Sequence, residues 1–586
     1  MLLNKSREDD GIIFAKVAVK AYFSPITRLF KTKYKKLSMK FLQLAELYER
    51  LDSTTKKLEK RDILAEFYKK CPEDQLYKSV LLSMATVFPR GDQELGIAVG
   101  MIKRVVERVT RASSKEVVDQ FKKTGDLGLA AEKLIERRKQ KSLVRRELTV
   151  DNVFDNLRKL PDITGEGSQD KKIALIAELL SAAGPKEARY IVRTVLGQMR
   201  IGVAAGIVRD AIAKAFDKPA AEVEHMYNLI GDYGHVAERA KKGKMKAELE
   251  LFRPVNVMLA DRGGDDIKAA VETFENPSIE TKYDGFRTII HKKGNEIKVF
   301  SRRLEDVTKQ FPDIVSWAKQ LDARECIVDG EAVAIKDGKT QPFQLLSRRI
   351  QRKYDIEKMV KDIPVQVNLF DMIYLDGKNY MKEPLKERWK ALGKIVKESK
   401  NLKLAEHIET KNVKEAEDFY NNALKNGQEG VIVKNMDAHY QPGRRVGYWL
   451  KVKPILEPLD LVVVGAEWGE GKRARWLSSV VLAARDGSKL VATGRMASGF
   501  TEEQLEELTK TLKPLITGEE GKIVTVKPQV VIEIGYEEIQ ASPKYESGYA
   551  LRFPRLLRVR SAEKGPKDAD TVKTIEKLFR MQRGRK

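Results

Sequence analysis

Apolar residues recur at helical spacing through the first part of the chain. The pattern begins near Met39 with FLQLAELYERL and continues through residues 61–71, 93–109 and 171–183. Apolar positions three and four residues apart gather on one face of an α-helix. We therefore predict an all-helical domain over residues 39–248. Residues 1–38 precede this periodicity, and we interpret them either as a flexible extension or as the product of an upstream start codon.

The pattern changes after the lysine-rich stretch that ends near residue 248. Short β-rich runs follow at residues 288–293, 296–301, 326–335 and 365–375, separated by Gly and Asp turns. This pattern of short strands and turns predicts a mixed α+β domain over residues 249–455. Lys453-Pro454 and Glu457-Pro458 mark a second break, because proline ends regular strand pairing.

Residues 456–586 contain further short strands, interrupted by the helical pattern TEEQLEELTKTLKPLI. One helix inserted into about five short strands is compatible with a β-barrel of the OB-fold type. The segment from Arg552 to Lys586 holds twelve Lys or Arg residues against four acids. We expect this basic tail to face phosphate and to bind it in a salt-sensitive manner.

Composition narrows the class of partner. The 586 residues carry a formal charge of +25 with a pI near 9.5, while 42% of them are hydrophobic. Such an imbalance favours a polyanion, with nucleic acid first, although a merely basic solvated surface is the alternative. Cys71 and Cys326 fit neither a disulfide framework nor a zinc site. Charged residues interrupt every apolar run of the N-terminus, so we expect no membrane span and a cytoplasmic protein.

The segment Glu280-Thr281-Lys282-Tyr283-Asp284-Gly285-Phe286-Arg287 carries the candidate chemistry. Lys282 ends a predicted strand, and Asp-Gly supplies the turn. For Lys282 to attack phosphorus its amine must be neutral, and burial together with nearby cations would lower its pKa. Taken alone, Lys-x-Asp-Gly is also an ordinary hairpin corner.

Further motifs follow this lysine in a fixed order. They are Ser301-Arg302-Arg303, Asp329-Gly330-Glu331, Phe370-Asp371, the segment EGVIVK over residues 429–434 and the segment WLKVKP over residues 449–454. With this ordered set the chain resembles the covalent nucleotidyltransferase superfamily, which transfers a nucleotide through a lysine adduct. The resemblance implies a nucleotidyltransferase (adenylation) domain with Lys282 as its nucleophile.

Each motif also has a physical reason. Glu331 and Glu429 follow strand-like runs and would present hard carboxylate oxygens to Mg²⁺, or to Mn²⁺, on a triphosphate. Lys451 and Lys453 share one strand face, and with Lys434 they would offset negative charge during phosphoryl transfer. The alternatives are two surface glutamates at strand ends and a solvated basic strand.

The resemblance implies roles for the remaining site residues. Glu280 would meet the adenine edge, Arg287 and Arg302 the ribose or phosphate region, and Phe370 would stack on the base. A core position is the alternative for Phe370. Arg558, in the last motif, would orient the pyrophosphate of ATP. The register of that motif is open, because Arg560 to Lys564 is one residue longer than the usual spacing.

The regions outside the nucleotidyltransferase domain indicate which substrate to expect. Gly184 to Arg193, followed by Leu196 to Gly202, resembles the DNA-binding domain of archaeal and eukaryotic ATP-dependent DNA ligases. Pro185 suits a helix start, while Gly197 and Gly202 permit close approach to phosphate; a structural helix pair is the alternative. The resemblance implies nick sealing in duplex DNA, in replication, repair and recombination. The alternative hypotheses are an RNA ligase, a GTP-using capping enzyme and a noncatalytic DNA-binding scaffold.

Three further expectations follow from this resemblance. Residues Gln140 to Val144 fall where archaeal ligases carry a segment that binds the sliding clamp, although Leu143 and Val144 replace the usual aromatics. We expect clamp binding there to be weakened, because smaller aliphatic anchors bury less apolar area. We also expect a monomer, associated with the nucleoid if the chain is archaeal.

Overall fold

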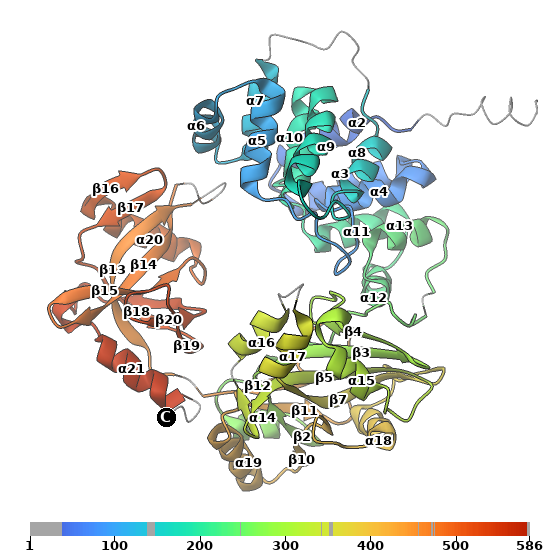
Figure 1. The fold of residues 1–586 in the computed structure, drawn as a ribbon, viewed down its shortest axis with the longest axis vertical. Helices are drawn as coiled ribbons and strands as arrows, with labels where there is room; N and C mark the ends of the chain where they lie inside the picture. Colours follow the sequence, from blue (N-terminus) through green and yellow to red (C-terminus); the bar gives the residue numbers. More distant parts are fainter. Residues whose placement is uncertain are drawn as a thin grey trace, which may run out of the picture.

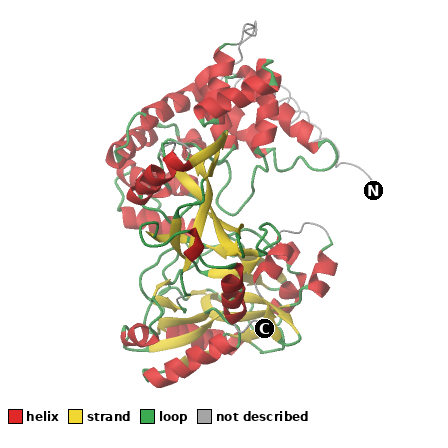
Figure 2. Cartoon of the chain, turned by 90° about the vertical axis from the view of Figure 1, so that its left-hand side faces the viewer, coloured by secondary structure: helices red, strands yellow, loops and turns green. Residues whose placement is uncertain are grey.

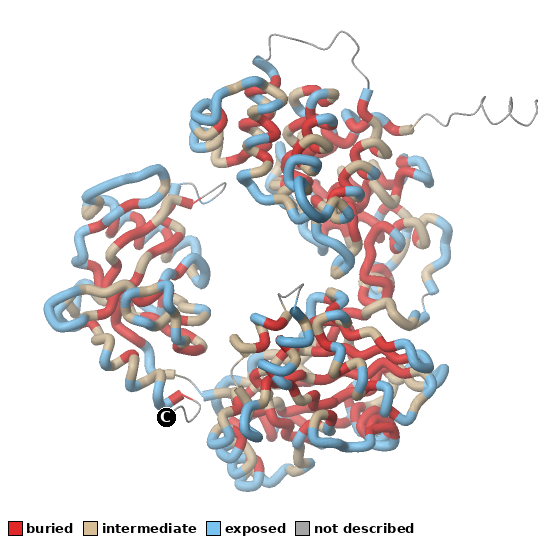
Figure 3. Tube along the Cα trace, in the orientation of Figure 1, coloured by how far each residue is buried: buried red, intermediate tan, exposed pale blue. Residues whose placement is uncertain are grey.

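The chain forms three regions that are arranged as an open C (Figure 1). The computed structural model describes residues 38–137, 147–246, 248–341, 343–350, 355–454, 456–469, 473 and 475–582. The predicted extension, apart from Ser38, and the predicted clamp-binding segment Gln140 to Val144 lie outside the described residues. Each region has its own buried interior (Figure 3).

The first region is helical, as the periodicity predicts (Figure 2). Its helices are α2 (Phe41–Asp52), α3 (Lys57–Lys70), α4 (Glu73–Ser83), α5 (Val99–Thr110), α6 (Ser114–Thr124), α7 (Leu127–Glu136), α8 (Val150–Arg158), α9 (Ser168–Ala182), α10 (Pro185–Val195), α11 (Ala205–Ala215), α12 (Ala220–Ile230) and α13 (Tyr233–Lys241). Pro185 occupies the first turn of α10. The helix expected from Gln93 begins only at Val99, because Gly96 adopts a left-handed φ of 62°.

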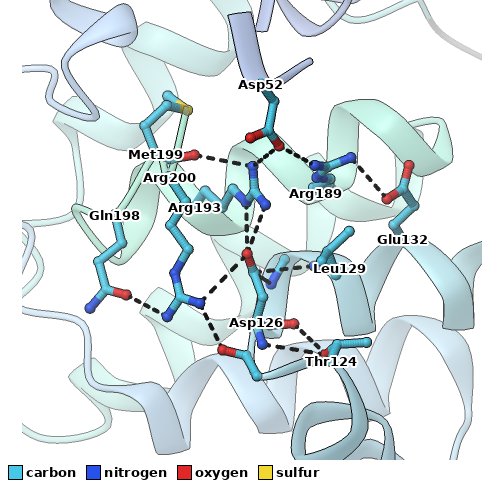
Figure 4. A network of polar contacts seen from close by, with 12 residues as sticks. Asp52, Thr124, Asp126, Leu129, Glu132, Arg189, Arg193, Gln198, Met199 and Arg200 are labelled. Atoms are coloured by element: carbon cyan, nitrogen blue, oxygen red, sulfur yellow. Dashed lines mark hydrogen bonds and ion pairs between the residues drawn. The ribbon is translucent and has the colours of Figure 1, made fainter. Parts of the chain in front are cut away.

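Buried charges fasten the helices of this region to one another (Figure 4). The guanidinium of Arg193 donates from Nε to Asp126 Oδ2 at 3.0 Å and from Nη1 to the carbonyl of Met199 at 3.1 Å. Asp126 also caps α7 by accepting from the backbone of Gly128 at 2.8 Å. Arg189, one turn earlier on α10, reaches Asp52 at 2.7 Å. The network therefore ties α10 to α2 and to the start of α7.

The central region contains two sheets. The smaller has the order β1-β12-β11-β2-β10, and the larger has the path β4-β3-β5-β7-β8 with β6 beside β5 and β9 beside β7. The strands of the smaller sheet are β1 (Asp261–Arg262), β2 (Pro277–Lys282), β10 (His407–Glu409), β11 (Gly430–Asn435) and β12 (Trp449–Val452). Those of the larger sheet are β3 (Phe286–Lys293), β4 (Glu296–Ser301), β5 (Glu325–Lys336), β6 (Lys339–Gln341), β7 (Val365–Leu375), β8 (Lys378–Asn379) and β9 (Leu402–Leu404).

Helices cover the outer faces of these sheets. They are α14 (Ile267–Glu272), α15 (Pro312–Ala318), α16 (Phe343–Ile350), α17 (Ile356–Asp362), α18 (Leu385–Ile395) and α19 (Val413–Lys425), with a 3₁₀ turn η1 (Thr308–Gln310). In the smaller sheet Ile279, Val431 and Val433 pack against α14 and α19. Because strand side chains alternate between faces, Glu280 and Lys282 share the opposite face. Alternation thus directs the polar motif residues toward the larger sheet.

The third region is rich in strands, as expected for an OB-type barrel. Its seven-stranded sheet has the path β15-β14-β13-β17-β16, with β18 pairing with β13 and β21, and β19 pairs with β20. The strands are β13 (Leu459–Trp468), β14 (Leu477–Asp486), β15 (Lys489–Met496), β16 (Ile516–Glu520), β17 (Ile523–Val526), β18 (Val531–Gly535), β19 (Glu538–Ala541), β20 (Tyr549–Arg552) and β21 (Arg555–Val559). The helices are α20 (Glu502–Leu512), which matches the predicted insertion, and α21 (Val572–Met581), with 3₁₀ turns η3 (Lys513–Leu515) and η4 (Pro566–Asp568).

None of the helices in the described part of the chain has the length and apolar character that crossing a bilayer requires.

Candidate active site

A cleft of about 970 Å³ lies between the two sheets of the central region. The smaller sheet supplies Glu280, Lys282, Lys434 and Lys451, and the larger sheet supplies Arg287, Glu331 and Phe370. Arg302, Glu429 and Lys453 complete the wall from loops beside these strands. The fold therefore brings together these predicted site residues, although Glu280 and Lys453 lie 173 positions apart in the sequence.

Lys282 ends strand β2, as predicted, and its ammonium pairs with the carboxylate of Glu429. Burial lowers the pKa of Lys282 to about 8, with Lys453 and Lys451 lowering it further and Glu331 and Asp284 opposing them. At that pKa a sizeable fraction of the amine is neutral near pH 8. The local environment therefore suits Lys282 to act as a nucleophile.

Two glycines permit the close approach of strands around Lys282. A Cβ atom on Gly285 would lie 2.8 Å from Glu331 Cγ, so a larger residue would push β3 away from β5. Gly430 pairs with Lys282 and has a φ of 135°, a conformation that favours glycine. A Cβ atom on Gly430 would also lie 3.2 Å from Lys453 Cα. Substitution at either position would widen the cleft beside the reactive amine.

Glu331 and Glu429 both lie near Lys282. Burial raises the pKa of Glu331 to about 7, while Arg287 and Lys282 lower it. A carboxylate that is buried with incomplete compensation gains from an added cation. Among the described residues no group of three His, Cys, Asp or Glu side chains could hold a metal ion. This pair of glutamates nevertheless fits Mg²⁺, which takes one or two carboxylates and completes its shell with water and substrate phosphate.

Lys434 lies at the inner end of the cleft and is fully buried. Its ammonium donates to Glu280 Oε2 at 2.6 Å and lies 4.5 Å from the ring centroids of both Phe370 and Trp449. Burial lowers the pKa of Lys434 and raises that of Glu280 to about 7. In this arrangement Glu280 and Lys434 act as a unit, whereas the sequence motifs suggest separate roles at adenine and at phosphate.

Arg287 is held rigidly by the larger sheet. Its Nε donates to Asp329 Oδ1 at 2.6 Å and its Nη2 to Asp329 Oδ2 at 2.5 Å, which is a bidentate pair. The guanidinium lies 4.7 Å from the centroid of Phe370, which is 6% exposed. Phe370 is thus both a core residue and a wall of the cleft, which combines the two interpretations of its sequence position.

Lys451 and Lys453 lie at the mouth of the cleft. Burial lowers the pKa of Lys451, and Lys453 lowers it further. Lys453 donates to Glu537 Oε2 of the third region at 2.9 Å. Arg552 and Phe553 of that region also line the cleft. The third region therefore contributes directly to the wall.

Arg558 does not line this cleft in the described structure. Its Nε donates to Glu533 Oε2 at 2.6 Å on strand β18, and the side chain is 55% exposed. Arg560 and Lys564 of the same motif both pair with Asp460, at 3.7 Å and 2.5 Å. The last motif thus packs onto its own region, and its contact with pyrophosphate stays a prediction.

The sequence motifs do not assign a role to several residues of the site. Trp449 lines the cleft, and Asp329 holds Arg287 from behind the cleft wall. Both belong to the motifs around Glu331 and Lys451, and this position was the available signal. Arg445 lies in a basic loop without a recognisable pattern, and Glu537 gives no signal because its partner Lys453 is 84 residues away.

Family models match all three regions of the chain. The family description "DNA ligase N terminus" matches residues 40–213, "ATP dependent DNA ligase domain" matches 257–453, and "ATP dependent DNA ligase C terminal region" matches 473–563. The solved structure entitled "Pmar-Lig_PreS3" shares the fold with a TM-score of 0.55 at 18% identity, covering 88% of this chain and 99% of that one.

Curated relatives match over almost their whole length. A DNA ligase of Thermococcus fumicolans is 45% identical over 553 residues, which cover 93% of this chain and 99% of the relative. A DNA ligase of Nanoarchaeum equitans is 46% identical, with the same coverage of both chains. That of Methanocaldococcus jannaschii is 40% identical and covers 94% of this chain and 100% of the relative. The chain belongs to the ATP-dependent DNA ligase family.

Proposed function

We propose that this DNA ligase seals nicks in duplex DNA through an AMP adduct on Lys282. The neutral amine attacks the α-phosphorus of ATP, so that an N–P bond forms while the bond to pyrophosphate breaks and the amine proton passes to water. AMP then moves to the 5′-phosphate of the nick and frees the lysine. Finally the 3′-hydroxyl attacks that phosphate and AMP leaves. The lowered pKa of Lys282 at the junction of two sheets is the observation that carries this proposal.

The other cleft residues would divide the binding of ATP between them. Phe370 and the buried Glu280–Lys434 pair lie together and would hold the base, while Arg287 and Arg302 would bind the sugar and phosphates. Lys451 and Lys453 would offset the charge that develops on phosphate. Glu331 and Glu429 would hold Mg²⁺, with Mn²⁺ as a substitute. A bound divalent ion would neutralise phosphate oxygens and orient the leaving group.

We also propose how the protein contacts DNA and in which oligomeric state it does so. The net charge of +25 supports a monomer that contacts the phosphate backbone of the nicked duplex. Such contacts position the nick without reading its sequence, and they agree with association with the nucleoid. Two comparisons would separate this function from RNA ligation and capping. The first asks whether nicked DNA or nicked RNA is sealed, and the second asks whether ATP or GTP is used.

The direct test is labelling with α-³²P-ATP and Mg²⁺. Wild-type protein should retain label after denaturation, and addition of nicked DNA should discharge it. Lys282→Ala should retain none, whereas Lys293→Ala, on a strand of the same region with its side chain 59% exposed, should label normally. Label on Lys282→Ala, or none on the wild type, would exclude the proposed adduct.

A further inference from the structure

Two arginines of the cleft stand on loops that the helical region holds from outside. Arg302 follows strand β4, and Arg445 precedes strand β12; both line the cleft. Burial lowers the pKa of Arg302, the guanidiniums of Arg287, Arg445 and Arg90 lower it further, and Glu331 opposes them. Arg302 and Arg445 therefore lie near one another although both are cations, and the loops that carry them are held by packing against the helical region.

The loop of Arg302 is held through Leu304. Leu304 is 1% exposed and has a left-handed φ of 72°, which costs a non-glycine residue roughly 1 kcal/mol or more. Leu304 approaches two loops of the helical region, with its backbone and Cβ at one loop and its Cδ1 at the other. A Cβ atom on Gly91 would lie 2.7 Å from Leu304 Cβ, and one on Gly231 would lie 4.0 Å from Leu304 Cδ1. Close packing against these glycines keeps the turn that begins at Ser301 in its strained form.

The loop of Arg445 is held through its neighbours Gly443 and Arg444. The guanidinium of Arg444 pairs with Glu224 on helix α12. A Cβ atom on Gly443 would lie 2.6 Å from Asn228 Oδ1, one turn further along the same helix. The carbonyl of Asn228 in turn accepts from the backbone of Asn256 at 3.1 Å. Helix α12 therefore rests directly on the loop that carries Arg445.

We infer that docking of the helical region positions Arg302 and Arg445 to bind the phosphates of the nucleotide, with Leu304 and Glu224 as the positioning residues. This inference rests on the proposed function of the cleft. Neither positioning residue lines the cleft, so each acts through the arginine beside it. The arrangement gives the helical region a part in binding ATP as well as its sequence-predicted part in binding DNA.

Charge reversal at the second contact tests the inference. Glu224→Arg would face Arg444 and also Arg209, whose guanidinium lies 3.5 Å from Glu224 in the native structure. We expect the ATP concentration for half-maximal labelling of Lys282 to rise about tenfold, or ~1.4 kcal/mol. The labelling rate at saturating ATP should stay near that of the wild type, because the lost contacts serve ground-state binding. The double variant with Arg444→Glu should recover much of the affinity.

Controls separate positioning from general damage. Glu222→Arg lies on the same helix and should leave the ATP requirement unchanged. Leu304→Ala should raise that requirement as Glu224→Arg does, with Arg302 intact. Thermal unfolding of each variant shows whether the regions remain folded. An unchanged ATP requirement in Glu224→Arg and Leu304→Ala, or no recovery in the double variant, would overturn the inference. Absence of label in the wild type would instead overturn the proposed function.

Discussion

The helical region and the central cleft both bury charged side chains, yet they balance them differently. In the helical region Arg193 has a carboxylate, Asp126, and a backbone carbonyl as partners. Burial alone would raise the pKa of Asp126, but Arg193 and other donors lower it below its usual value. In the cleft, burial dominates instead and moves Lys282 and Glu331 toward their neutral forms, with pKa values of about 8 and about 7.

This difference separates residues that stabilise the fold from residues that take part in the reaction. A fully paired arginine stabilises one packing of helices and has no reactive protonation state. A lysine whose burial outweighs its pairing is ready to lose a proton, which is the condition for nucleophilic attack. The cleft contains both kinds, because Arg287 is locked onto Asp329 while Lys282 lies close by with a lowered pKa. The locked residues supply a rigid frame for the reactive one.

The largest expected effect comes from breaking the paired network. Arg193→Ala removes the nearer cation of the buried Asp126 and leaves Arg200 at 3.9 Å, which should cost about 3 kcal/mol. The unfolding temperature of the helical region should fall by about 10 °C, measured by calorimetry. Arg104→Ala removes an exposed pair with Asp170 and should change stability by less than about 0.5 kcal/mol. Equal effects of the two substitutions would remove the distinction between buried and exposed pairs.

An intermediate effect should follow in the cleft. Glu331→Gln removes one of the two carboxylates proposed to hold Mg²⁺ and should raise the Mg²⁺ concentration for half-maximal labelling by about 100-fold. Stability should not fall, because the native carboxylate is buried at a cost. Glu325→Gln, on the same strand but outside the cleft, is the control. A loss of stability without a change in Mg²⁺ dependence would mean that Glu331 has a structural role and does not bind the metal.

The smallest effect is expected where the third region meets the cleft. Lys453 and Glu537 are 25% and 26% exposed, so their pair contributes less than about 1 kcal/mol. Glu537→Gln frees Lys453 and should lower the ATP concentration for half-maximal labelling by about twofold, ~0.4 kcal/mol. Glu520→Gln, an exposed position of the same region, should have no effect. A higher ATP requirement in Glu537→Gln would mean that Glu537 supports the nucleotide site.

The sequence by itself determined the local elements and the reactive groups. Helical periodicity predicted α2, α3 and α9, short β-rich runs between turns predicted β3 to β5 and β7, and the ordered motifs around Lys282 indicated the family. These signals are local, because they depend on spacing along one strand or helix. The predicted start of α5 was wrong, because Gly96 adopts a left-handed conformation within a sequence that has helical periodicity.

Only the tertiary structure decided which charges meet. Glu280 pairs with Lys434 across 154 residues, Lys453 with Glu537 across 84, and Arg444 with Glu224 across 220. No residue type or spacing encodes such a pair, because either partner could have faced solvent or another charge. Burial, which sets the pKa of Lys282, likewise arises only when two sheets enclose the same space. The reactivity of that lysine is therefore a property of the assembled fold.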